Sequence, residues 1–432
     1  MRIRLSRPNA IFWALYLVVL LWCYHNSSDD PGSAFYRPHE AFSSSHSRQR
    51  EAEVDAYIGK VAASTVPITT TASAQMNEYL CIGIPSVNRT RPDFLARTLG
   101  SLTDTLSPAE RAGVHIVVLL ADRAPQLHTA YGQPWLSRLA DDVLVYDSDG
   151  IDLSELPAKS DPDDAYRIIK WDVLGRGRGD NREENIRLDH SILVDACRQR
   201  TGNPYFALIE DDVMASRDWF RRLAYGVTAI ELRTRETGRE WLYLRLFHSE
   251  FFMGWNSEEA MVYLKYIFGF YVVLSAVLLI TLRRRRRRGG LKGGQPPSAQ
   301  SISHIMAMAL GLWTPACIAL FFLAGRVTWH RLLLWHSPVW NPAPNGVREM
   351  PQYGCCAQGL VYPYRQLDGL QRILRSEPWT TPGDMLVETH AEQKELVKWA
   401  LDPSVLQHAG IAETEDGGET TNVWNFSFER MG

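Results

Sequence analysis

Two uninterrupted apolar stretches in the middle of the chain limit how it can fold. Neither Tyr266–Leu282 nor Ile305–Ala324 contains a charged residue, and six consecutive arginines, Arg283–Arg288, follow the first. Amphipathic core helices would carry a polar face, which these stretches lack. Segments of about 17 to 20 apolar residues are long enough to cross a bilayer. We therefore predict a membrane hairpin with a short basic loop.

The distribution of basic residues predicts how the chain is oriented in the membrane. Basic loops stay on the cytoplasmic side, so the chain on both sides of the hairpin is expected in the lumen. The N-terminus predicts the same orientation, because three arginines precede an apolar run, Ala10–Tyr24. The bulky residues after that run offer no signal-peptide cleavage site, which favours an uncleaved anchor. Its length, about 15 residues, suits a thin membrane of the secretory pathway.

Two other functions for these segments fit the sequence less well. Arg283–Arg288 could form a nucleic-acid or nuclear-localisation patch. Its position beside an apolar stretch instead predicts contact with anionic lipid headgroups and no nucleic-acid partner. Three spans could also form a transporter, but apart from His304 at one edge of the hairpin the spans carry no ionisable residue of the kind that transport pathways use.

These features divide the chain into five parts. We predict a cytoplasmic tail with signal anchor (1–25), a lumenal stem (26–75), the first part of a lumenal domain (76–262), the membrane hairpin (263–326) and the second part of that domain (327–432). The stem is polar and rich in Ser and Thr, so it cannot bury enough apolar surface to fold alone. The second lumenal part is short and poor in strand patterning, so we expect it to complete the first.

The first lumenal part has the pattern of an α/β domain. Short apolar runs predict strands, and amphipathic stretches between them predict helices. Strands are predicted at Tyr79–Ile84, Val114–Leu120, Val143–Tyr146 and Tyr205–Ile209, and helices at Phe94–Leu106 and Ile186–Cys197. Strands that alternate with helices favour a mostly parallel sheet with helices on both faces.

Acidic residues follow three of the predicted strands. Glu210, Asp211 and Asp212 come directly after the Tyr205–Ile209 strand, and Asp122 and Asp147 follow two others. In open α/β sheets, ligands bind beyond the carboxyl ends of the strands. Adjacent carboxylates there repel each other unless a cation neutralises them, and Mg²⁺ or Mn²⁺ can also hold a substrate's phosphates. The alternative is a solvated acidic turn.

Four motifs, taken in order, resemble those of a known enzyme class. CIGIPSVNR…FLARTLGSL, HIVVLLAD, YFALIEDDV and PSVLQHAG are similar to motifs of membrane-bound glycosyltransferases with a GT-A fold. The broad match is to N-glycan branching N-acetylglucosaminyltransferases. The hairpin inside the domain resembles the Golgi N-acetylgalactosamine transferases of GPI glycans, the post-GPI-attachment-to-proteins family. The expected fold is therefore a GT-A-like nucleotide-sugar transferase domain interrupted by a transmembrane hairpin, plus an N-terminal anchor.

The resemblance implies a function and a location. The expected reaction transfers N-acetylgalactosamine from UDP-GalNAc to a mannose of the GPI glycan, with Mn²⁺ as cofactor. The chain would be a multi-pass Golgi membrane protein with a lumenal catalytic domain, and GPI-anchored proteins or the GPI glycan would be its acceptors. The alternatives are an N-acetylglucosaminyltransferase of N-glycans on the same fold and a non-catalytic glycan-binding membrane protein.

The same resemblance implies roles for individual residues. Glu210, Asp211 and Asp212 correspond to the DxD motif, with Asp212 on the metal and Asp211 near the ribose or metal-bound water. His408 matches a C-terminal histidine that contacts metal or diphosphate, although it could equally be structural. Donor contacts are also expected from the loop Ile84–Arg89, which includes Arg89, and from Asp122.

An inverting transfer also requires a general base on the acceptor hydroxyl. Asp384, at a predicted helix start in TPGDML, is the first candidate and Glu388 is the second. Both could instead be helix-capping or surface carboxylates.

The cysteines leave several pairings open. The six cysteines include no CxxC pair, which argues against a zinc site built on cysteine. In an oxidising lumen, Cys355 or Cys356 could pair with Cys81 or Cys197 and so join the two lumenal parts; buried free thiols are the alternative. Cys23 and Cys317 lie in membrane segments and are expected to serve in packing.

Two further features complete the expectations. Of the three N-glycosylation sequons, the one at Asn425 is expected to be modified, because a glycan on Asn88 would crowd the donor site and Asn26 lies close to the membrane. The Gly- and Arg-rich region Lys170–His190 matches no known role and is interpreted as a loop over the donor site.

Overall fold

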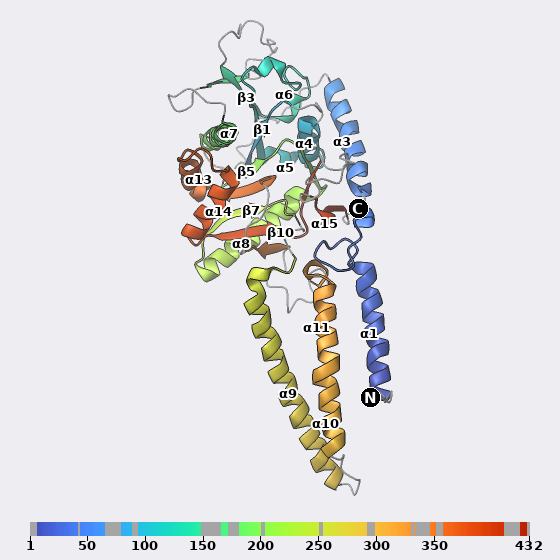
Figure 1. The fold of residues 1–432 in the computed structure, drawn as a ribbon. Helices are drawn as coiled ribbons and strands as arrows, with labels where there is room; N and C mark the ends of the chain where they lie inside the picture. Colours follow the sequence, from blue (N-terminus) through green and yellow to red (C-terminus); the bar gives the residue numbers. More distant parts are fainter. Residues whose placement is uncertain are drawn as a thin grey trace. The chain divides into compact units, whose positions relative to one another are not determined.

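The structure is a computed structural model in two compact units. It describes residues 7–41, 44–64, 79–88, 94–147, 166–171, 181–199, 204–249, 254–291, 299–329, 332, 346–350, 357–409 and 424–429. Met1–Ser43 and Glu250–Asn341 form one unit, which we call the helical unit. Ser44–Ser249 and Pro342–Gly432 form the other, the sheet unit (Figure 1).

Among its described residues, the helical unit holds three helices that are long and apolar enough to cross a membrane. Its elements are α1 (Arg7–Asn26), α2 (Pro38–Ala41), η4 (Ser257–Glu259), α9 (Ala260–Leu291), α10 (Ala299–Met308), the π-helical turn η5 (Ala309–Trp313) and α11 (Thr314–Leu323). The candidate spans are Pro8–Asn26, Ala260–Arg284 and Met306–Leu323. The first is 19 residues long, so the N-terminal helix is longer than its apolar run indicates.

The six arginines are helical rather than a loop. The structure continues α9 through Arg283–Arg288 to Leu291, so the prediction of a basic loop at these residues is wrong. Arginine has a high helix propensity, and a helix that has already formed extends readily into such residues. The connection to α10 lies outside the described residues.

Polar contacts hold the N-terminal helix to the α10–α11 helix. Trp313 Nε1 donates to Asn9 Oδ1 at 3.0 Å, and Tyr16 Oη donates to the carbonyl oxygen of Ala316 at 3.2 Å. The Phe12 and Trp313 rings stack with centroids 5.1 Å apart. Cys23 is buried against α11 residues, in keeping with a packing role. α1 is therefore fixed to the α10–α11 helix by side chains that also satisfy buried polar groups.

The segment directly after α1 is ordered within the helical unit. Asp30 is fully buried and accepts a hydrogen bond from the Thr328 backbone N at 2.8 Å and one from Gly32 N at 2.9 Å. Gly325 has φ +86°, and a Cβ at this position would lie 2.3 Å from Asp30 Oδ2. Residues 27–41 thus differ from the predicted free stem, because a buried carboxylate fixes them to the chain after α11.

The sheet unit is a mixed α/β structure. Its strands are β1 (Leu80–Ser86), β2 (Val114–Leu120), β3 (Asp142–Asp147), β4 (Arg167–Lys170), β5 (Tyr205–Ile209), β6 (Val213–Ala215), β7 (Trp241–Arg245), β8 (Val347–Glu349), β9 (Gly359–Pro363), β10 (Val397–Leu401) and β11 (Leu406–His408). Its helices are α3 (Ser45–Ala63), α4 (Phe94–Thr103), α5 (Pro108–Ala112), η1 (Pro125–Leu127), α6 (Leu136–Leu139), α7 (Arg182–Arg198), α8 (Trp219–Thr237), η6 (Tyr364–Gln366), α13 (Leu367–Leu374), α14 (Gly383–Gln393) and α15 (Phe426–Glu429).

One large sheet organises this unit. Its strand order is β4-β3-β2-β1-β5-β9-β7-β10-β8, and β6 pairs with β11 in a separate two-stranded sheet. The pairs from β4 to β5 are parallel, whereas β9 runs antiparallel to both β5 and β7. Strands from both sides of the apolar helices in the sequence therefore form one sheet.

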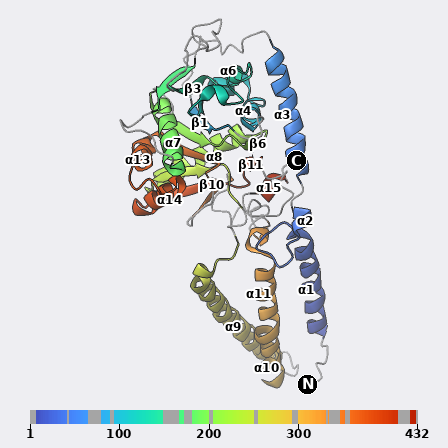
Figure 2. The same cartoon turned by 45° about the horizontal axis from the view of Figure 1, so that its top comes forward.

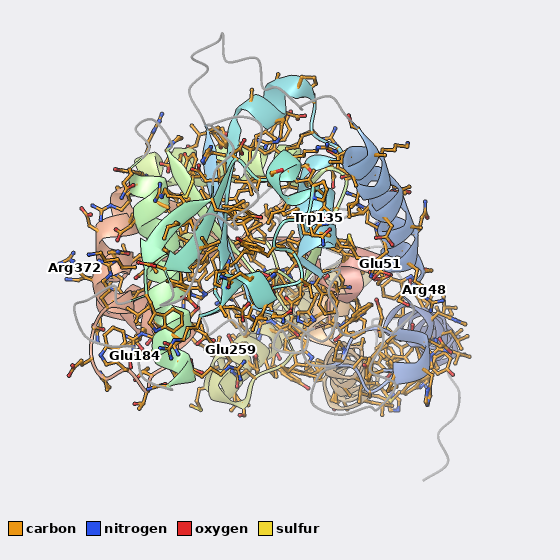
Figure 3. All side chains as sticks on the ribbon, turned by 90° about the horizontal axis from the view of Figure 1, so that it is seen from above. Arg48, Glu51, Trp135, Glu184, Glu259 and Arg372 are labelled. Carbon is orange, nitrogen blue, oxygen red and sulfur yellow. A yellow bond between two sulfur atoms is a disulfide. The ribbon has the colours of Figure 1, made fainter. Side chains whose placement is uncertain are left out.

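Alternating side chains of the buried strands face two separate cores. On β2, Ile116 and Val118 face the core covered by α4, α6 and α8, while Val117 and Leu119 face the core covered by α7, α13 and α14. This is the period-two pattern of a strand buried on both faces. The views in Figures 1 and 2 both show α7, α13 and α14 together. Charged side chains such as Arg48 on α3 and Arg372 on α13 point outward (Figure 3).

The helix α3 corrects the prediction that residues 26–75 form a stem. The residues of α3 belong to the sheet unit, and Arg50 on its inner face is 1% exposed. Arg50 donates to Asp104 Oδ1 at 2.6 Å and to the Ala215 carbonyl oxygen at 2.9 Å. This buried arginine, with several acceptors, thus helps to fix a mostly polar helix, together with the apolar contacts of Val54 and Val61.

Two glycines provide a matched test of this packing. A Cβ on Gly100 of α4 would lie 2.8 Å from Val54 Cγ1 of α3, whereas a Cβ on Gly59 of α3 meets nothing within 4 Å. We expect Gly100→Ala to lower the free energy of unfolding by about 1–3 kcal/mol through overpacking. Gly59→Ala should raise it by about 0.5–1 kcal/mol, because glycine is unfavourable inside a helix. Chemical denaturation of the two variants checks the difference, and equal effects would contradict close packing of α3 on α4.

The disulfide differs from the predicted pairing between lumenal parts. Cys81 of β1 pairs with Cys197 of α7, with Cα atoms 5.8 Å apart. Both cysteines precede α9 in the sequence, so neither joins that part of the chain to Cys355 or Cys356, which lie outside the described residues. The bond fixes α7 to β1, an interior strand of the sheet. Cys317 is a free, exposed cysteine rather than a buried packing residue.

Candidate functional site

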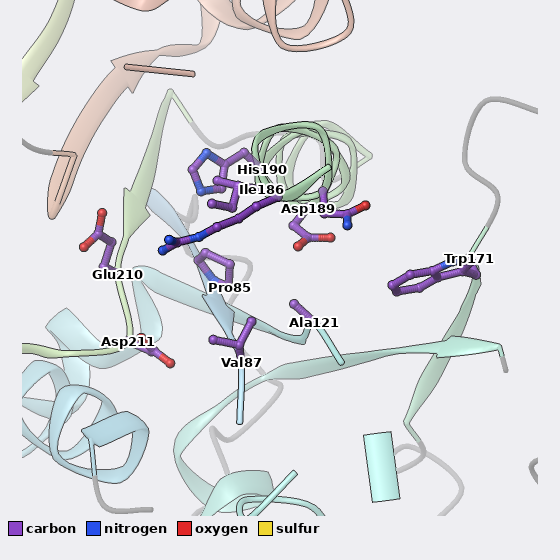
Figure 4. Close-up of a pocket in the computed structure, with 11 residues that line it drawn as sticks. Pro85, Val87, Ala121, Trp171, Ile186, Asp189, His190, Glu210 and Asp211 are labelled. Atoms are coloured by element: carbon purple, nitrogen blue, oxygen red, sulfur yellow. The ribbon is translucent and has the colours of Figure 1, made fainter. Parts of the chain in front are cut away.

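The carboxyl ends of three parallel strands meet at one edge of the sheet. β1 ends at Ser86, β2 is followed by Asp122, and β5 is followed by the Glu210–Asp212 carboxylates. β1 pairs in parallel with both β2 and β5, so these ends are adjacent. A cavity of about 480 Å³ opens at this edge. It is lined by residues at or directly after the ends of β1, β2, β4 and β5 and by residues of α7, and Figure 4 shows them.

A chain of hydrogen bonds orients the Asp211 carboxylate. Ser86 Oγ donates to Asp211 Oδ2 at 2.7 Å, and His128 Nε2 lies 3.1 Å from the same Ser86 hydroxyl. His128 Nδ1 accepts from the Ala130 backbone N at 3.1 Å, which leaves Nε2 as the protonated, donating nitrogen. Burial lowers the pKa of His128, so the ring stays neutral and keeps this tautomer. His128 thus positions Asp211 through Ser86.

The backbone of the acidic turn is fixed from the neighbouring helix. The Thr98 hydroxyl of α4 donates to the Asp211 carbonyl oxygen at 2.8 Å and accepts from Val213 N at 3.1 Å. Thr98 is fully buried. Asp211 and Asp212 are also nearly buried, at 3% and 4% exposed. The predicted alternative of a solvated acidic turn does not describe these two residues.

The small second sheet brings His408 to Asp212. β11 pairs antiparallel with β6, with His408 opposite Val213. The Ala409 backbone N donates to the Asp212 carbonyl oxygen at 2.8 Å, which extends the pairing by one residue. His408 Nε2 lies 3.4 Å from Asp212 Oδ2. An imidazole from the end of the chain and a carboxylate from its middle therefore form one pair.

This pair fits a divalent cation that also binds substrate. Ligand atoms at about 2.1 Å from an octahedral ion lie roughly 3 Å apart, close to the observed spacing of 3.4 Å. Within the described ranges no group of three His, Cys, Asp or Glu side chains could hold a metal. Ions such as Mg²⁺ often take only one or two protein ligands and complete their shell with water and substrate phosphates. Asp212 and His408 suit that kind of site.

The helix α7, predicted from the sequence over Ile186–Cys197, supplies a wall of the cavity; its first turn and its place in the site were not predicted. It begins at Arg182, with the Asn181 side chain accepting from Glu183 N at 3.0 Å as N-cap. Its cavity-lining residues are Arg182, Asn185, Ile186, Asp189 and His190. Figure 4 shows Asp189 and His190 on this helix, with Glu210 and Asp211 on another side of the cavity. The Asn-x-x-Glu start was the available sequence signal for this helix.

Aromatic residues support the same wall. The Tyr146 hydroxyl of β3 donates to the buried Asp189 carboxylate. Trp171, at the end of β4, packs edge-on against the Tyr146 ring with centroids 4.7 Å apart and lines the cavity. The described ends of the Lys170–His190 region thus contribute directly to the site.

The other predicted donor contacts have different outcomes. Asp122 accepts a hydrogen bond from Asn88 N at 2.8 Å and lies 3.9 Å from His128, so it borders the network around Asp211. Arg89 lies outside the described residues. Its role stays a prediction.

The two predicted general bases have contrasting surroundings, and neither lines the cavity. Asp384 is exposed in the first turn of α14, where its Oδ1 accepts from Met385 N at 2.8 Å. Glu388 is buried on the same helix and accepts from Arg245 at 2.6 Å and Lys398 Nζ at 2.8 Å. The Tyr243 hydroxyl donates to it as well. The contacts of Glu388 are those of a structural ion cluster.

The Asn425 sequon is inaccessible, contrary to expectation. Asn425 is fully buried, and its Nδ2 donates to the His248 carbonyl oxygen at 2.6 Å and to Ser404 Oγ at 2.9 Å. Its Oδ1 accepts from Phe428 N. We therefore expect no glycan on Asn425. The mass that the protein loses on N-glycosidase treatment can be measured for the wild type and for Asn425→Gln. We expect this loss to be the same in both; a loss that is smaller in Asn425→Gln would contradict the buried placement.

A histidine in the cavity predicts how stability depends on pH. Burial lowers the pKa of His190 from 6.5 to about 4. The unfolded chain therefore binds a proton that the folded chain does not, and stability falls as the pH drops from about 6.5 towards 4. Hydrogen exchange of α7 at pH 7 and pH 5 should show this loss, and His190→Gln should reduce it. His39→Gln, at an exposed histidine, is the control and should leave the loss of stability as in the wild type. A loss of stability in His190→Gln as large as in the wild type would show that His190 is not its cause.

The sequence is similar to two groups of glycosyltransferases. The family model described as GPI-N-acetylgalactosamine transferase PGAP4 matches residues 161–407, more than half of the chain. The chain is also similar to proteins named alpha-1,3-mannosyl-glycoprotein 4-beta-N-acetylglucosaminyltransferase C. The Mus musculus protein is 25% identical over 163 residues, and the Macaca fascicularis protein 24% over 163 residues. Both matches cover 36% of this chain and 31% of the relative, so the chain spans about a third of their length.

Proposed function

Because the chain belongs to the GPI-N-acetylgalactosamine transferase family, we propose that it transfers N-acetylgalactosamine from UDP-GalNAc to a mannose of the GPI-anchor glycan. The observation that carries this proposal is the pairing of His408 with Asp212 at a strand edge beside the cavity. The family match begins before the acidic turn and extends to Gln407 in β11, so it includes Asp212 and most of β11. A GT-A-like fold and a Golgi membrane location belong to the same proposal.

The residues at the strand edge suit the binding of a nucleotide diphosphate sugar. The cavity volume, about 480 Å³, lies within the usual range for small-molecule sites. We propose that Trp171 and the α7 residues of the cavity contact the donor, while Asp211 is held in one orientation by Ser86. When bound, Mn²⁺ or Mg²⁺ on Asp212 and His408 would neutralise charge on the diphosphate leaving group.

The proposed reaction inverts the anomeric centre. The acceptor hydroxyl forms a bond to the anomeric carbon, the bond from that carbon to the diphosphate oxygen breaks, and UDP leaves with the electron pair. The hydroxyl proton goes to a general base. Asp384 remains the proposed base, since its carboxylate is exposed, whereas the Glu388 carboxylate is already bound by Arg245 and Lys398.

A donor and acceptor panel tests the proposal. Purified full-length protein in nanodiscs would be given UDP-GalNAc or UDP-GlcNAc, each with a GPI glycan or an N-glycan as acceptor. We expect transfer only from UDP-GalNAc to the GPI glycan. The names of the curated relatives support a second candidate, transfer of N-acetylglucosamine to an N-glycan. Product formed only from UDP-GlcNAc on the N-glycan would overturn the first proposal in favour of the second.

A further inference from the structure

The helical unit contains a large apolar groove that the proposed reaction does not use. Its volume is about 1030 Å³, and it lies among α1, α9, η5 and α11. The walls are apolar and aromatic side chains such as Phe12, Phe270, Leu274, Leu278 and Phe321. Because these helices are candidate membrane spans, the groove faces hydrocarbon rather than water once the chain is in a bilayer.

The geometry of the helices keeps the groove open. α9 and the α10–α11 helix are close at the end where α9 meets α10 and diverge towards their other ends (Figure 1). The π-helical turn η5 interrupts the second of these helices beside the groove, and two of its residues, Ala309 and Trp313, line it. Trp313 is fixed to α1 by the Asn9 hydrogen bond and the Phe12 stack, so its indole cannot swing in to fill the space. Such π-helical turns occur often at functional sites.

A space of this size requires an occupant. Protein interiors contain few voids larger than a water molecule. Water is a poor occupant, because the polar groups on the walls are few and waters in cavities need two to four polar partners. In a membrane the available apolar molecule is lipid, and an acyl chain restores the dispersion contacts that the lining side chains otherwise lack.

One end of the groove carries groups suited to a lipid headgroup. Trp255 and Tyr263 line this end, and such aromatic residues favour the membrane–water interface. Arg326 pairs with Glu259 at 2.8 Å and lies 6.0 Å from the Trp255 ring centroid. Its side chain is 40% exposed. A guanidinium has five N–H donors, so Arg326 can also donate to a phosphate.

We propose that this groove binds one glycerophospholipid of the bilayer, with an acyl chain between α9 and α11 and the phosphate at Arg326. The bound lipid fills the space between the hairpin helices and holds them at their observed separation. This site is independent of the transfer reaction, because none of its residues lines the cavity beside Asp212.

Photo-crosslinking tests the site directly. Full-length protein would be placed in phosphatidylcholine nanodiscs containing a phosphatidylcholine with a diazirine in one acyl chain. Crosslinks are expected to be several-fold more frequent on Leu274 and Leu278 than on Val273 and Val277, the exposed neighbours on the same helix. Equal crosslinking of all four residues would show ordinary bilayer contact only and would overturn the proposal.

Matched substitutions give a second, independent readout. Leu274→Trp fills the groove, whereas Val273→Trp places the same indole outside it, at a residue that is 62% exposed. The first should reduce lipid that is retained through detergent exchange and detected by native mass spectrometry, and the second should leave it unchanged. Equal retention in both variants would contradict the site. If Leu274→Trp does not insert, the Leu278→Trp and Val277→Trp pair answers the same question.

The headgroup part of the proposal has its own test. Arg326→Gln should reduce crosslinking by the phosphatidylcholine probe several-fold and leave crosslinking by a diacylglycerol with the same diazirine chain unchanged. Loss of both probes to the same extent would show that Arg326 maintains the structure of the groove and does not bind phosphate. Retention of both at the wild-type level would likewise exclude a phosphate contact.

Discussion

Replacing Asp212 with asparagine is expected to lower kcat by about 10²–10³-fold, which is the usual cost of losing one group that stabilises charge developing in the transition state. The Asp212 side chain is nearly buried and lies 3.4 Å from His408 Nε2. The hydrogen bond from Ala409 N goes to the main-chain carbonyl oxygen of Asp212, not to its side chain. The substitution therefore changes the charge of the side chain while the β6–β11 pairing stays in place. Kinetics of transfer over a range of Mn²⁺ concentrations would measure the effect.

Asp147→Asn is the matched control for this substitution. Asp147 is the last residue of β3, a parallel strand of the same sheet, and its side chain is exposed. We expect this control to retain activity at every Mn²⁺ concentration. An Asp212→Asn enzyme with wild-type kcat would show that the acidic turn does not hold a catalytic cation.

Replacing Glu388 with glutamine is expected to destabilise the sheet unit by about 3–5 kcal/mol, the usual cost of removing one partner from a buried ion pair. Glu388 is 3% exposed and pairs with both Arg245 and Lys398. The substitution removes the carboxylate charge that both of these buried cations contact. Native domains are stable by only about 5–15 kcal/mol, so the loss would be a large part of the total. Denaturation followed by hydrogen exchange of β7 and β10 would measure it.

Comparing Glu388→Gln with Asp384→Asn distinguishes a carboxylate that stabilises the fold from one that takes part in catalysis. Asp384 lies on the same helix but is exposed, so its substitution should leave the free energy of unfolding within about 0.5 kcal/mol of wild type. As the proposed general base, it should nevertheless lower kcat strongly. A Glu388→Gln protein that is as stable as wild type but inactive would reverse these two assignments.

The strands at the site could be predicted well from the sequence. The predicted bounds of Val114–Leu120 and Tyr205–Ile209 coincide with β2 and β5. These strands are buried on both faces, so each is a continuous apolar run that ends sharply at polar residues. The same pattern places the carboxylates at the strand ends, and the structure shows Asp211 and Asp212 buried at that edge.

Contacts between distant parts of the chain could not be predicted in the same way. The approach of His408 to Asp212 depends on the pairing of β11 with β6, and nothing in the local sequence fixes that register. The burial of Glu388 depends on cations from β7 and β10, whereas its local sequence indicates only an acidic residue on a helix. Tertiary ion pairs of this kind leave no periodic signal.

The helix α3 was missed for a different reason. Its overall polarity suggested a stem, yet Val54, Ile58 and Val61 recur at helical spacing, and all three are near α4 or the main core. The sequence therefore did contain a helical apolar pattern, but this pattern covers only a narrow face of the helix. The buried Arg50, with its bonds to Asp104 and Ala215, adds to these apolar contacts in holding so polar a helix.

The most direct test of the proposed function is complementation of cells that lack the GPI-modifying N-acetylgalactosamine transferase. Wild-type protein and Asp212→Asn would be expressed at equal levels, and released GPI glycans would be analysed by mass spectrometry for the N-acetylgalactosamine branch. The proposal predicts that the branch returns with the wild type and stays absent with Asp212→Asn. No branch with correctly localised wild-type protein would contradict the proposed acceptor and donor, and a branch restored by both would contradict the proposed site.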